Sequence, residues 1–320
     1  MMKAKTTICS LACLWSGYAC STGYVSGQEQ QYIHDGLSLS GSLGYLGGES
    51  KEYVYFDGRQ LSRLDWKIKN AAIIKLEANY DVLPWLSVNA SGWTTLASGS
   101  GSMNDYDWQN TSSTDYTDSS SSSAVLNEAN EFDLNLRGWL LNTNDYKAGV
   151  IVGYQQTRFS MTARNGTYDY AGTDANDDYD PNAPRDVGSF PRNQNLVGYS
   201  QTYKTPYIGL TGKYSINKFE FSTLLKYSHW VEASDSDNHY LNKEITETNN
   251  NNAELWSGEV NAGYWVTPNA KVFTVATYTY YPNKKGDIGK WDSDGYESMS
   301  DGGGIQNRNW SLTAGLQYLW

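Results

Sequence analysis

The sequence predicts an all-β fold, a ten-stranded antiparallel transmembrane β-barrel with long extracellular loops and short periplasmic turns. Three observations predict it. Apolar and polar side chains alternate with a period of two along most of the chain, the last such segment ends on an aromatic residue, and the 320 residues include 26 Tyr, 12 Trp and 30 Gly. Side chains of a strand point alternately to opposite faces, so this period gives each strand one apolar and one polar face. A helix would require a period of 3.6.

The final segment shows the pattern most clearly. Every even position from Trp310 to Trp320 is apolar or aromatic, and most odd positions are small or polar. A strand of this kind that runs to the last residue is typical of the closing strand of an outer-membrane barrel, with Tyr318 and Trp320 in the aromatic girdle. The last strand of a soluble sandwich is the alternative, which the pattern of the whole chain disfavours.

The chain begins with a segment that resembles a secretory signal peptide. Residues 1–21 contain Lys3 and Lys5, a mostly apolar run and then small residues. We expect residues 22–320 to form the exported protein, as a single barrel domain. Because Cys9, Cys13 and Cys20 lie in or beside the signal, the exported chain is expected to have no disulfide, no thiol nucleophile and no cysteine metal site. Lipoprotein processing at Cys20 is the alternative.

Ten alternating segments can be counted, at residues 37–45, 74–80, 86–90, 132–140, 146–154, 208–214, 219–221, 256–264, 272–278 and 310–320. Four tight turns of Asn, Asp and Pro type lie near residues 81–85, 142–145, 217–218 and 267–269. Five longer polar stretches lie near residues 46–60, 97–125, 170–197, 233–245 and 282–305. We expect the turns on the periplasmic side and the polar stretches as surface loops that carry the function, with strands projecting beyond the membrane.

Charge and size exclude several classes of function. Without Lys3 and Lys5, 22 basic residues face 35 acidic ones, a net charge of −13. This charge disfavours nucleic acid as a partner and favours cationic partners. No run of about twenty apolar residues follows the signal, so no membrane-spanning helix is expected. Side chains fill most of the interior of a barrel of about ten strands, which disfavours a wide pore.

His239 is the histidine best placed for chemistry, since His34 and His229 are interpreted as structural. It ends the stretch Asp235-Ser-Asp237-Asn-His239. In an extended strand, Asp237 and His239 share one face, about 7 Å apart along the strand. A carboxylate beside an imidazole orients the ring and makes it a better base. The alternative is a solvated acid near a histidine in a polar loop.

Paired aspartates occur four times in an Asp-x-Asp pattern: Asp105/Asp107, Asp178/Asp180, Asp235/Asp237 and Asp292/Asp294. Two carboxylates about 4 Å apart repel by roughly 4 kcal/mol at an effective dielectric of about 20, so such a pair can share a proton or hold a water molecule. Most surface pairs do neither. The sequence has no serine-hydrolase, zinc-protease or phosphate-loop motif, and no metal site is predicted. An enzyme of this kind would activate water with carboxylates and His239.

Seven stretches resemble the omptin family of outer-membrane endoproteases and occur in family order across residues 36–320: Leu64–Lys67, Asn70–Ile74, Gly92–Leu96, Ala129–Asn135, Gly138–Asn142, Pro206–Gly212 and Val266–Lys271. The resemblance implies a ten-stranded barrel, in agreement with the strand count. It also implies peptide hydrolysis by water held between an Asp pair and a His-Asp dyad.

The family's catalytic motifs are both complete here, as Met103-Asn-Asp-Tyr-Asp-Trp108 and Ser234-Asp-Ser-Asp-Asn-His-Tyr240. The resemblance implies that Asp237 orients His239, the general base, while Asp105 and Asp107 position the water and stabilise the developing charge. It further implies an acidic specificity pocket made by Glu52 and Asp235, which selects Arg or Lys, and a groove lined by Met103.

Members of the family require lipopolysaccharide as an activating lipid, and no other cofactor is expected. The residues that match its binding site are Tyr154, Arg158 and Lys204, whereas Gln156 and Thr202 depart from the family pattern. The alternative is that Arg158 and Lys204 only extend their charges toward the membrane interface.

The sequence therefore predicts an aspartic-type endopeptidase of the Gram-negative outer membrane, with its active site facing the cell exterior. Its expected partners are basic peptides or proteins, often dibasic at the cleavage site, and lipopolysaccharide. The alternatives are a non-enzymatic barrel that acts as an adhesin or invasin, and a narrow transport channel.

Overall fold

The computed structural model describes residues 36–110, 113–176 and 178–320. The expected signal peptide, the three cysteines and His34 lie outside the described residues. The described residues form twelve strands: β1 (Leu37–Phe56), β2 (Arg59–Leu83), β3 (Leu86–Thr95), β4 (Gly99–Asp107), β5 (Asp118–Asn142), β6 (Tyr146–Tyr170), β7 (Asp186–Ser189), β8 (Asn195–Ile216), β9 (Phe219–His239), β10 (Glu244–Trp265), β11 (Ala270–Asp292) and β12 (Gly295–Leu319).

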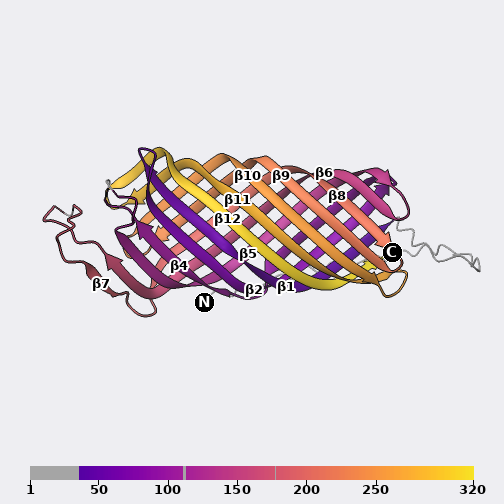
Figure 1. Ribbon diagram of the computed structural model, residues 1–320, viewed down its shortest axis with the longest axis horizontal. Coiled ribbons are helices and arrows are strands. Elements are labelled where there is room, and N and C mark those ends of the chain that lie inside the picture. Colours follow the sequence, from indigo (N-terminus) through magenta and orange to yellow (C-terminus); the bar gives the residue numbers. More distant parts are fainter. Residues whose placement is uncertain (1–35, 111–112, 177) are drawn as a thin grey trace, which may run out of the picture. The chain divides into compact units, whose positions relative to one another are not determined.

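All strand pairings are antiparallel, and they close into a ring. Each of β3 and β4 pairs with both β2 and β5, so these two short strands are successive halves of one position. Strand β7 is an addition beside β6. The pairings of β1 with β12 and of β5 with β6 join the remaining edges. The result is a cylinder with ten strand positions, which confirms the predicted ten-stranded barrel (Figure 1).

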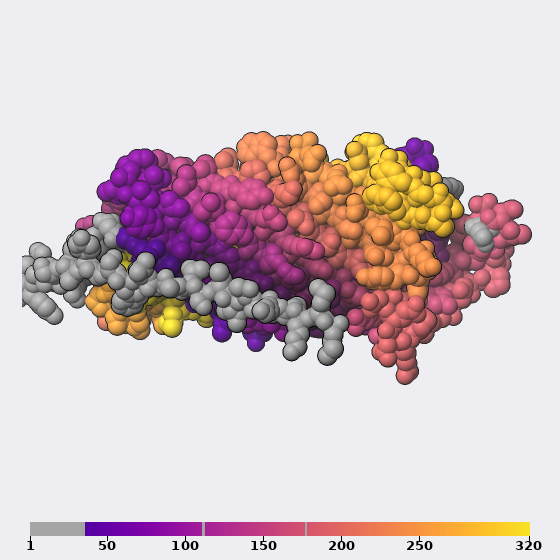
Figure 2. All heavy atoms as spheres, turned by 180° about the vertical axis from the view of Figure 1, so that it is seen from behind, coloured from indigo at the N-terminus to yellow at the C-terminus, as the bar shows by residue number. Residues whose placement is uncertain are grey.

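The four predicted tight turns are confirmed, and all lie at one end of the barrel. They connect β2 to β3, β5 to β6, β8 to β9 and β10 to β11 through residues 84–85, 143–145, 217–218 and 266–269. The C-terminus lies at this end in Figure 1, whereas β7 lies at the opposite end. Figure 2 likewise shows the yellow β11–β12 hairpin at the opposite end, beside the projecting segment that follows β6.

The stretches interpreted as surface loops are mostly strand, which differs from the expectation. Strands β1 and β2 meet at the two-residue turn Asp57-Gly58, in which both residues have positive φ, 48° and 78°. Such turns favour Asp-Gly because glycine adopts positive φ without steric cost. Beyond the membrane both faces of a hairpin can be polar, so alternation disappears while the backbone hydrogen bonds continue. Residues 171–176 and 178–185 belong to the longest connection between strands that the structure describes.

An apolar belt surrounds the half of the barrel nearest the tight turns. Its outward side chains are exposed and come from β1, β2, β5, β6 and β8–β12, among them Leu43, Leu76, Leu140, Val152, Leu210, Leu225, Val260, Val272, Leu312 and Leu316. The even residues of the final segment belong to it, with Tyr318 and Trp320 exposed and their rings 4.6 Å apart. An outward apolar band flanked by aromatic residues is the membrane-facing surface of a transmembrane barrel. No helix among the described residues is long and apolar enough to cross a membrane.

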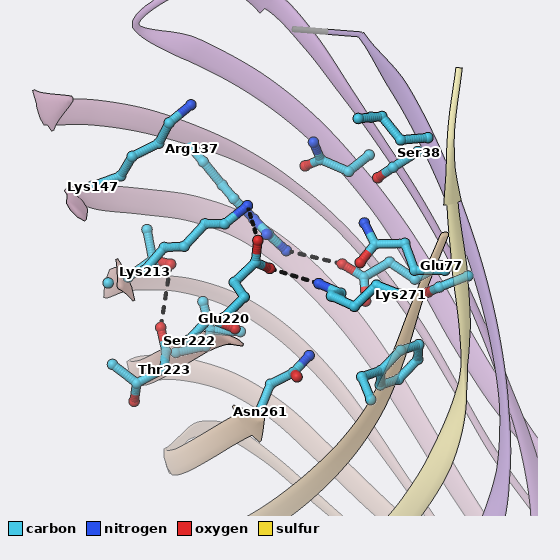
Figure 3. Close-up of a pocket in the computed structure, with 18 of the residues that line it drawn as sticks. Ser38, Glu77, Arg137, Lys147, Lys213, Glu220, Ser222, Thr223, Asn261 and Lys271 are labelled. Atoms are coloured by element: carbon cyan, nitrogen blue, oxygen red, sulfur yellow. Dashed lines mark hydrogen bonds and ion pairs between the residues drawn. The ribbon is translucent and has the colours of Figure 1, made fainter. Parts of the chain in front are cut away.

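The interior of this half is filled by charged side chains that pair with one another. Lys75 lies 2.8 Å from Glu259, Lys226 lies 2.5 Å from Asp133, and Lys271 lies 2.6 Å from Glu220. Close to the tight turns a cavity of about 130 Å³ is lined by charged side chains, among which Glu220 accepts from both Lys213 and Lys271 (Figure 3). These paired charges occupy the lumen of this half of the barrel.

Candidate active site

The predicted site residues lie on the strand extensions beyond the apolar belt, not in loops. Glu52 is in β1, Met103, Asp105 and Asp107 are in β4, and Asp235, Asp237 and His239 are in β9. Strands β4 and β9 are four positions apart in the ring of ten, because β5, β6 and β8 lie between them. Inward side chains of these two strands therefore face one another across the interior.

The dyad is formed within β9. The Nε2 atom of His239 lies 3.1 Å from Oδ2 of Asp237, at hydrogen-bond distance. The two residues are two positions apart, so alternation places both side chains on the inner face, as expected. The carboxylate of Asp237 is fully buried, whereas the imidazole is 29% exposed. Asp237 is thus held in place while one edge of the ring remains accessible.

The environment of His239 favours its charged form. Burial by itself lowers the pKa of the imidazole. The charge and hydrogen bond of Asp237 and the charges of Asp105 and Glu244 outweigh this effect and raise the pKa to about 9. Glu244 is the direct neighbour of His239 on β10. The ring is therefore a strong base once it has lost its proton.

The aspartate pair on β4 interacts with the dyad. Burial and the charge of Asp107 raise the pKa of Asp105, and the positive charge of His239 opposes that rise. Burial also raises the pKa of Asp107. A hydrogen bond from Ser62 lowers that pKa, whereas the neighbouring charge of Asp118 raises it. The charge of His239 acts on both carboxyls. The structure thus brings the two predicted motifs to one site.

The two acids expected in the specificity pocket lie beside the dyad. The hydroxyl of Tyr199 donates to Oδ2 of Asp235 over 3.0 Å, and the backbone N–H of Thr248 donates to Oδ1 over 2.8 Å. Burial nevertheless raises the pKa of Asp235 to about 7. Glu52 is only 2% exposed, and burial followed by the charges of Asp237 and Asp235 raises its pKa well above the ordinary value. Two buried acids here can bind one cationic side chain.

Met103 is buried, with 2% of its surface exposed, and belongs to an apolar cluster below the site. The same cluster contains Trp66, whose ring stacks on that of Tyr199 with centroids 5.5 Å apart. Met103 and Trp66 are direct partners on β4 and β2. This packing fixes the backbone that carries Asp105 and the phenol that holds Asp235.

Residues near the site that were not found from the sequence include Asp118, Tyr199, Glu244 and Thr248. Strand pairing brings three of them to the site, with Asp118 opposite Asp107, Tyr199 opposite Asp237 and Glu244 opposite His239. Register between distant strands has no local sequence signal, so only the structure assigns them. The Asp-Gly turn at residues 57–58 did carry a signal, which would have predicted the long β1–β2 hairpin.

The remaining aspartate pairs serve local turns. Asp180 accepts the backbone N–H of Asn182 over 2.9 Å, and Asp292 accepts that of Asp294 over 2.9 Å. Asp292 also lies 3.1 Å from Lys290. An Asp-x-Asp spacing alone therefore does not define the site.

The residues expected to bind lipopolysaccharide lie on the outer face. Tyr154 and Arg158 of β6 and Lys204 of β8 are all exposed. Gln156 pairs with Lys204 and Arg158 with Thr202, so the five positions form one patch. The Nζ atom of Lys204 lies 3.3 Å from a carboxylate oxygen of Glu232. The Asn249–Asn252 tract lies within β10.

Comparisons with known proteins agree with this arrangement. A model described as the omptin family matches residues 33–320. The chain is 43% identical over 324 residues to a plasminogen activator of Yersinia pestis, with 99% of each chain covered. It is 44% identical over 306 residues to protease 7 of Escherichia coli O157:H7, covering 93% of this chain and 94% of that protein.

The fold also matches a solved structure. The crystal structure of outer membrane protease OmpT from Escherichia coli superimposes with a TM-score of 0.84 at 43% identity, covering 89% of this chain and 97% of that chain. Outer membrane protease OmpP of Escherichia coli K12 is 43% identical over 289 residues, covering 88% of this chain and 90% of that protein. These relatives identify a protease that resides in the outer membrane.

Proposed function

The chain belongs to the omptin family of outer-membrane proteases, and from this premise we propose that it is an endopeptidase that cleaves after Arg or Lys. The observation that carries the proposal is the interaction of the His239–Asp237 dyad with Asp105 and Asp107 across the barrel interior. A water molecule between these groups would have a base on one side and carboxyls on the other.

In this mechanism His239 removes a proton from the water as it attacks the peptide carbonyl. Asp237 orients the ring and stabilises the imidazolium that forms. The raised pKa of Asp105 favours a protonated carboxyl, which can donate a hydrogen bond where negative charge develops. The imidazolium then returns its proton to the leaving amine. The reaction needs no metal and no covalent intermediate in this scheme.

Specificity for a basic residue is assigned to Glu52 and Asp235. Both are buried beside Asp237, so an arginine or lysine side chain that reaches them places its carbonyl near the dyad. A guanidinium can bind two carboxylates at once, which compensates for its removal from water. A neutral side chain would leave both acids without a cation.

Lipopolysaccharide is proposed as the activating lipid, through the outer patch of Tyr154, Arg158 and Lys204. An arginine beside a tyrosine just beyond the apolar belt fits a lipid phosphate. Because Glu232 already pairs with Lys204, Arg158 is expected to supply most of the attraction. The open side of the site would face the cell exterior, since the tight turns face the periplasm in barrels of this type.

Hydrolysis of a fluorogenic Arg-Arg peptide by refolded protein with lipopolysaccharide tests the proposal. Wild type should cleave after arginine, and Asp105→Ala and His239→Ala should abolish cleavage while the proteins remain folded. If all three are equally inert, the barrel acts by another route, and binding of host cells or matrix proteins tests the adhesin alternative. Passage of small solutes through reconstituted protein would instead indicate a channel.

A further inference from the structure

Three buried carboxylate oxygens of the site have no hydrogen-bond donor among the described residues, namely Oδ1 of Asp105, Oε2 of Glu52 and Oδ1 of Asp237. The last two belong to residues that are 2% and 0% exposed. The other oxygen of each is engaged, since Thr246 Oγ1 lies 3.4 Å from Oε1 of Glu52 and His239 holds Oδ2 of Asp237. A buried polar atom left unpaired is destabilising, and more so when it is charged.

These two side chains are in contact with each other. The side chains of Glu52 of β1 and Asp237 of β9 lie within hydrogen-bonding range of each other. Two ionised carboxylates are both acceptors, so neither can donate. A hydrogen bond between them therefore requires one proton, and a proton placed between the two free oxygens satisfies both.

The charges around Glu52 make this proton stable. Asp235 and Asp237 of β9 add negative charge, as does Asp105 of β4 when it is ionised, and Tyr199 of β8 is held at Asp235. His239 is the cation of the cluster, and it faces Asp105 and Asp237. The nearby cations Lys51 and Arg63 are already paired with Asp65, over 3.0 and 3.1 Å. Burial and these neighbours together raise the pKa of Glu52 well above its usual value.

We propose that one proton joins Glu52 to Asp237 in the empty site and that the cationic side chain of a substrate displaces it to solvent. Glu52 is then a positioning residue that couples the specificity pocket to the dyad. While the proton is shared, Asp237 divides its charge between Glu52 and His239. When a guanidinium replaces the proton, Glu52 binds the cation and Asp237 serves His239 as a full carboxylate. The inference rests on the proposed function of this pocket.

The exchange balances without any further reactant. The O–H bond of the shared carboxyl breaks, its proton passes to the buffer, and the substrate's positive charge takes the place of the proton's charge. The total charge of the buried cluster is therefore unchanged. A neutral side chain of the same shape cannot make this exchange. The proton then stays between Glu52 and Asp237, and Asp237 gives His239 only part of its negative charge.

Calorimetry measures the displaced proton directly. The probe is an arginine peptide whose scissile bond is N-methylated, titrated at pH 7 in buffers of different ionisation enthalpy. Its control replaces arginine by citrulline, which has the same shape without the charge. Wild type should release close to one proton per arginine peptide more than Glu52→Gln does. The citrulline peptide should release almost none and bind at least tenfold more weakly.

Kinetics give a second, independent readout. The amide that Glu52→Gln introduces donates permanently to Asp237, with or without a substrate cation. This variant should therefore lower kcat for the arginine peptide to the value that wild type shows with citrulline, besides raising KM. A residue that only binds substrate would change KM alone. Retained heat-modifiable migration of Glu52→Gln on gels would show that the barrel is folded.

The outcomes separate the inference from the function. If wild type cleaves after arginine but releases no more protons than Glu52→Gln, the shared proton is refuted and the protease assignment stands. An arginine peptide that is neither bound nor cleaved overturns both. Cleavage with a proton difference near one and a lowered kcat in Glu52→Gln supports both.

Discussion

The imidazole of His239 lies 3.1 Å from the carboxylate of Asp237, and Glu244 on the adjacent strand faces the same ring. These acids raise the pKa of His239 to about 9 despite burial, which acts in the opposite direction. A base must be deprotonated to act, so kcat/KM should rise with pH up to about 9. A profile that stays flat from pH 5 to 8 would contradict the role of His239 as base.

The same pKa can be observed without turnover. A carbon-labelled histidine titration by NMR should show the His239 ring titrating near pH 9 in detergent-solubilised wild type. Asp237→Asn removes the largest charge that raises this pKa, so the titration should move to lower pH.

Removal of one carboxyl from the aspartate pair should stop hydrolysis without unfolding the barrel. We expect Asp105→Asn to lower kcat by about 10²–10⁴-fold, because the pair positions water and stabilises charge that develops in the transition state. Asp178→Asn is the matched control, since Asp178 is exposed and belongs to a pair with the same spacing. Equal activity in the two variants would exclude the pair on β4 from catalysis.

Neutralisation of Asp235 should weaken recognition of basic residues. The carboxylate is buried and is held by Tyr199 and Thr248, so the amide of Asp235→Asn should occupy the same place without the negative charge. The expected effect is a loss in kcat/KM for arginine peptides equivalent to about 2–5 kcal/mol, or roughly 30-fold or more. Glu297→Gln removes an exposed carboxylate at the same end and should have little effect. Unchanged selectivity in Asp235→Asn would place the pocket elsewhere.

Loss of one interior cation should destabilise the barrel. Lys226 lies 2.5 Å from Asp133, whose side chain is 2% exposed, so Lys226→Met leaves a buried carboxylate without its partner. Breaking such a pair costs about 3–5 kcal/mol, whereas replacing both partners by apolar residues is often neutral. Urea unfolding followed by tryptophan fluorescence should show the loss in Lys226→Met and its recovery in Lys226→Met/Asp133→Leu. A double variant no more stable than the single one would argue against an uncompensated charge as the cause.

The outer patch should govern the response to lipopolysaccharide. Arg158→Ala should raise the lipid concentration needed for half-maximal activity by about tenfold, while kcat at saturating lipid stays the same. Lys204→Ala should have a smaller effect, because Glu232 already neutralises that lysine. Lipid titrations of peptide hydrolysis measure both. If the two variants match wild type, these cations only extend toward the interface.

Local patterns in the sequence determined the barrel and the parts of its site that are continuous in the chain. Alternation at positions such as Trp310 to Trp320 indicated which face meets the membrane, because the strand period of two is a property of each residue's neighbours. The motifs around Asp105 and His239 indicated the catalytic groups by resemblance. The polar hairpins beyond the membrane were interpreted as loops, since alternation vanishes where both faces are polar.

Only the tertiary structure decided which of these groups act together. Asp178/Asp180 and Asp105/Asp107 have the same spacing, yet the first pair serves a local turn and the second interacts with His239. The contact of Glu52 with Asp237 joins strands that are far apart in the sequence and four positions apart in the ring. Closure of the barrel and the register of its strands create that contact. Both depend on hydrogen bonds between distant segments, which no local pattern of residues specifies.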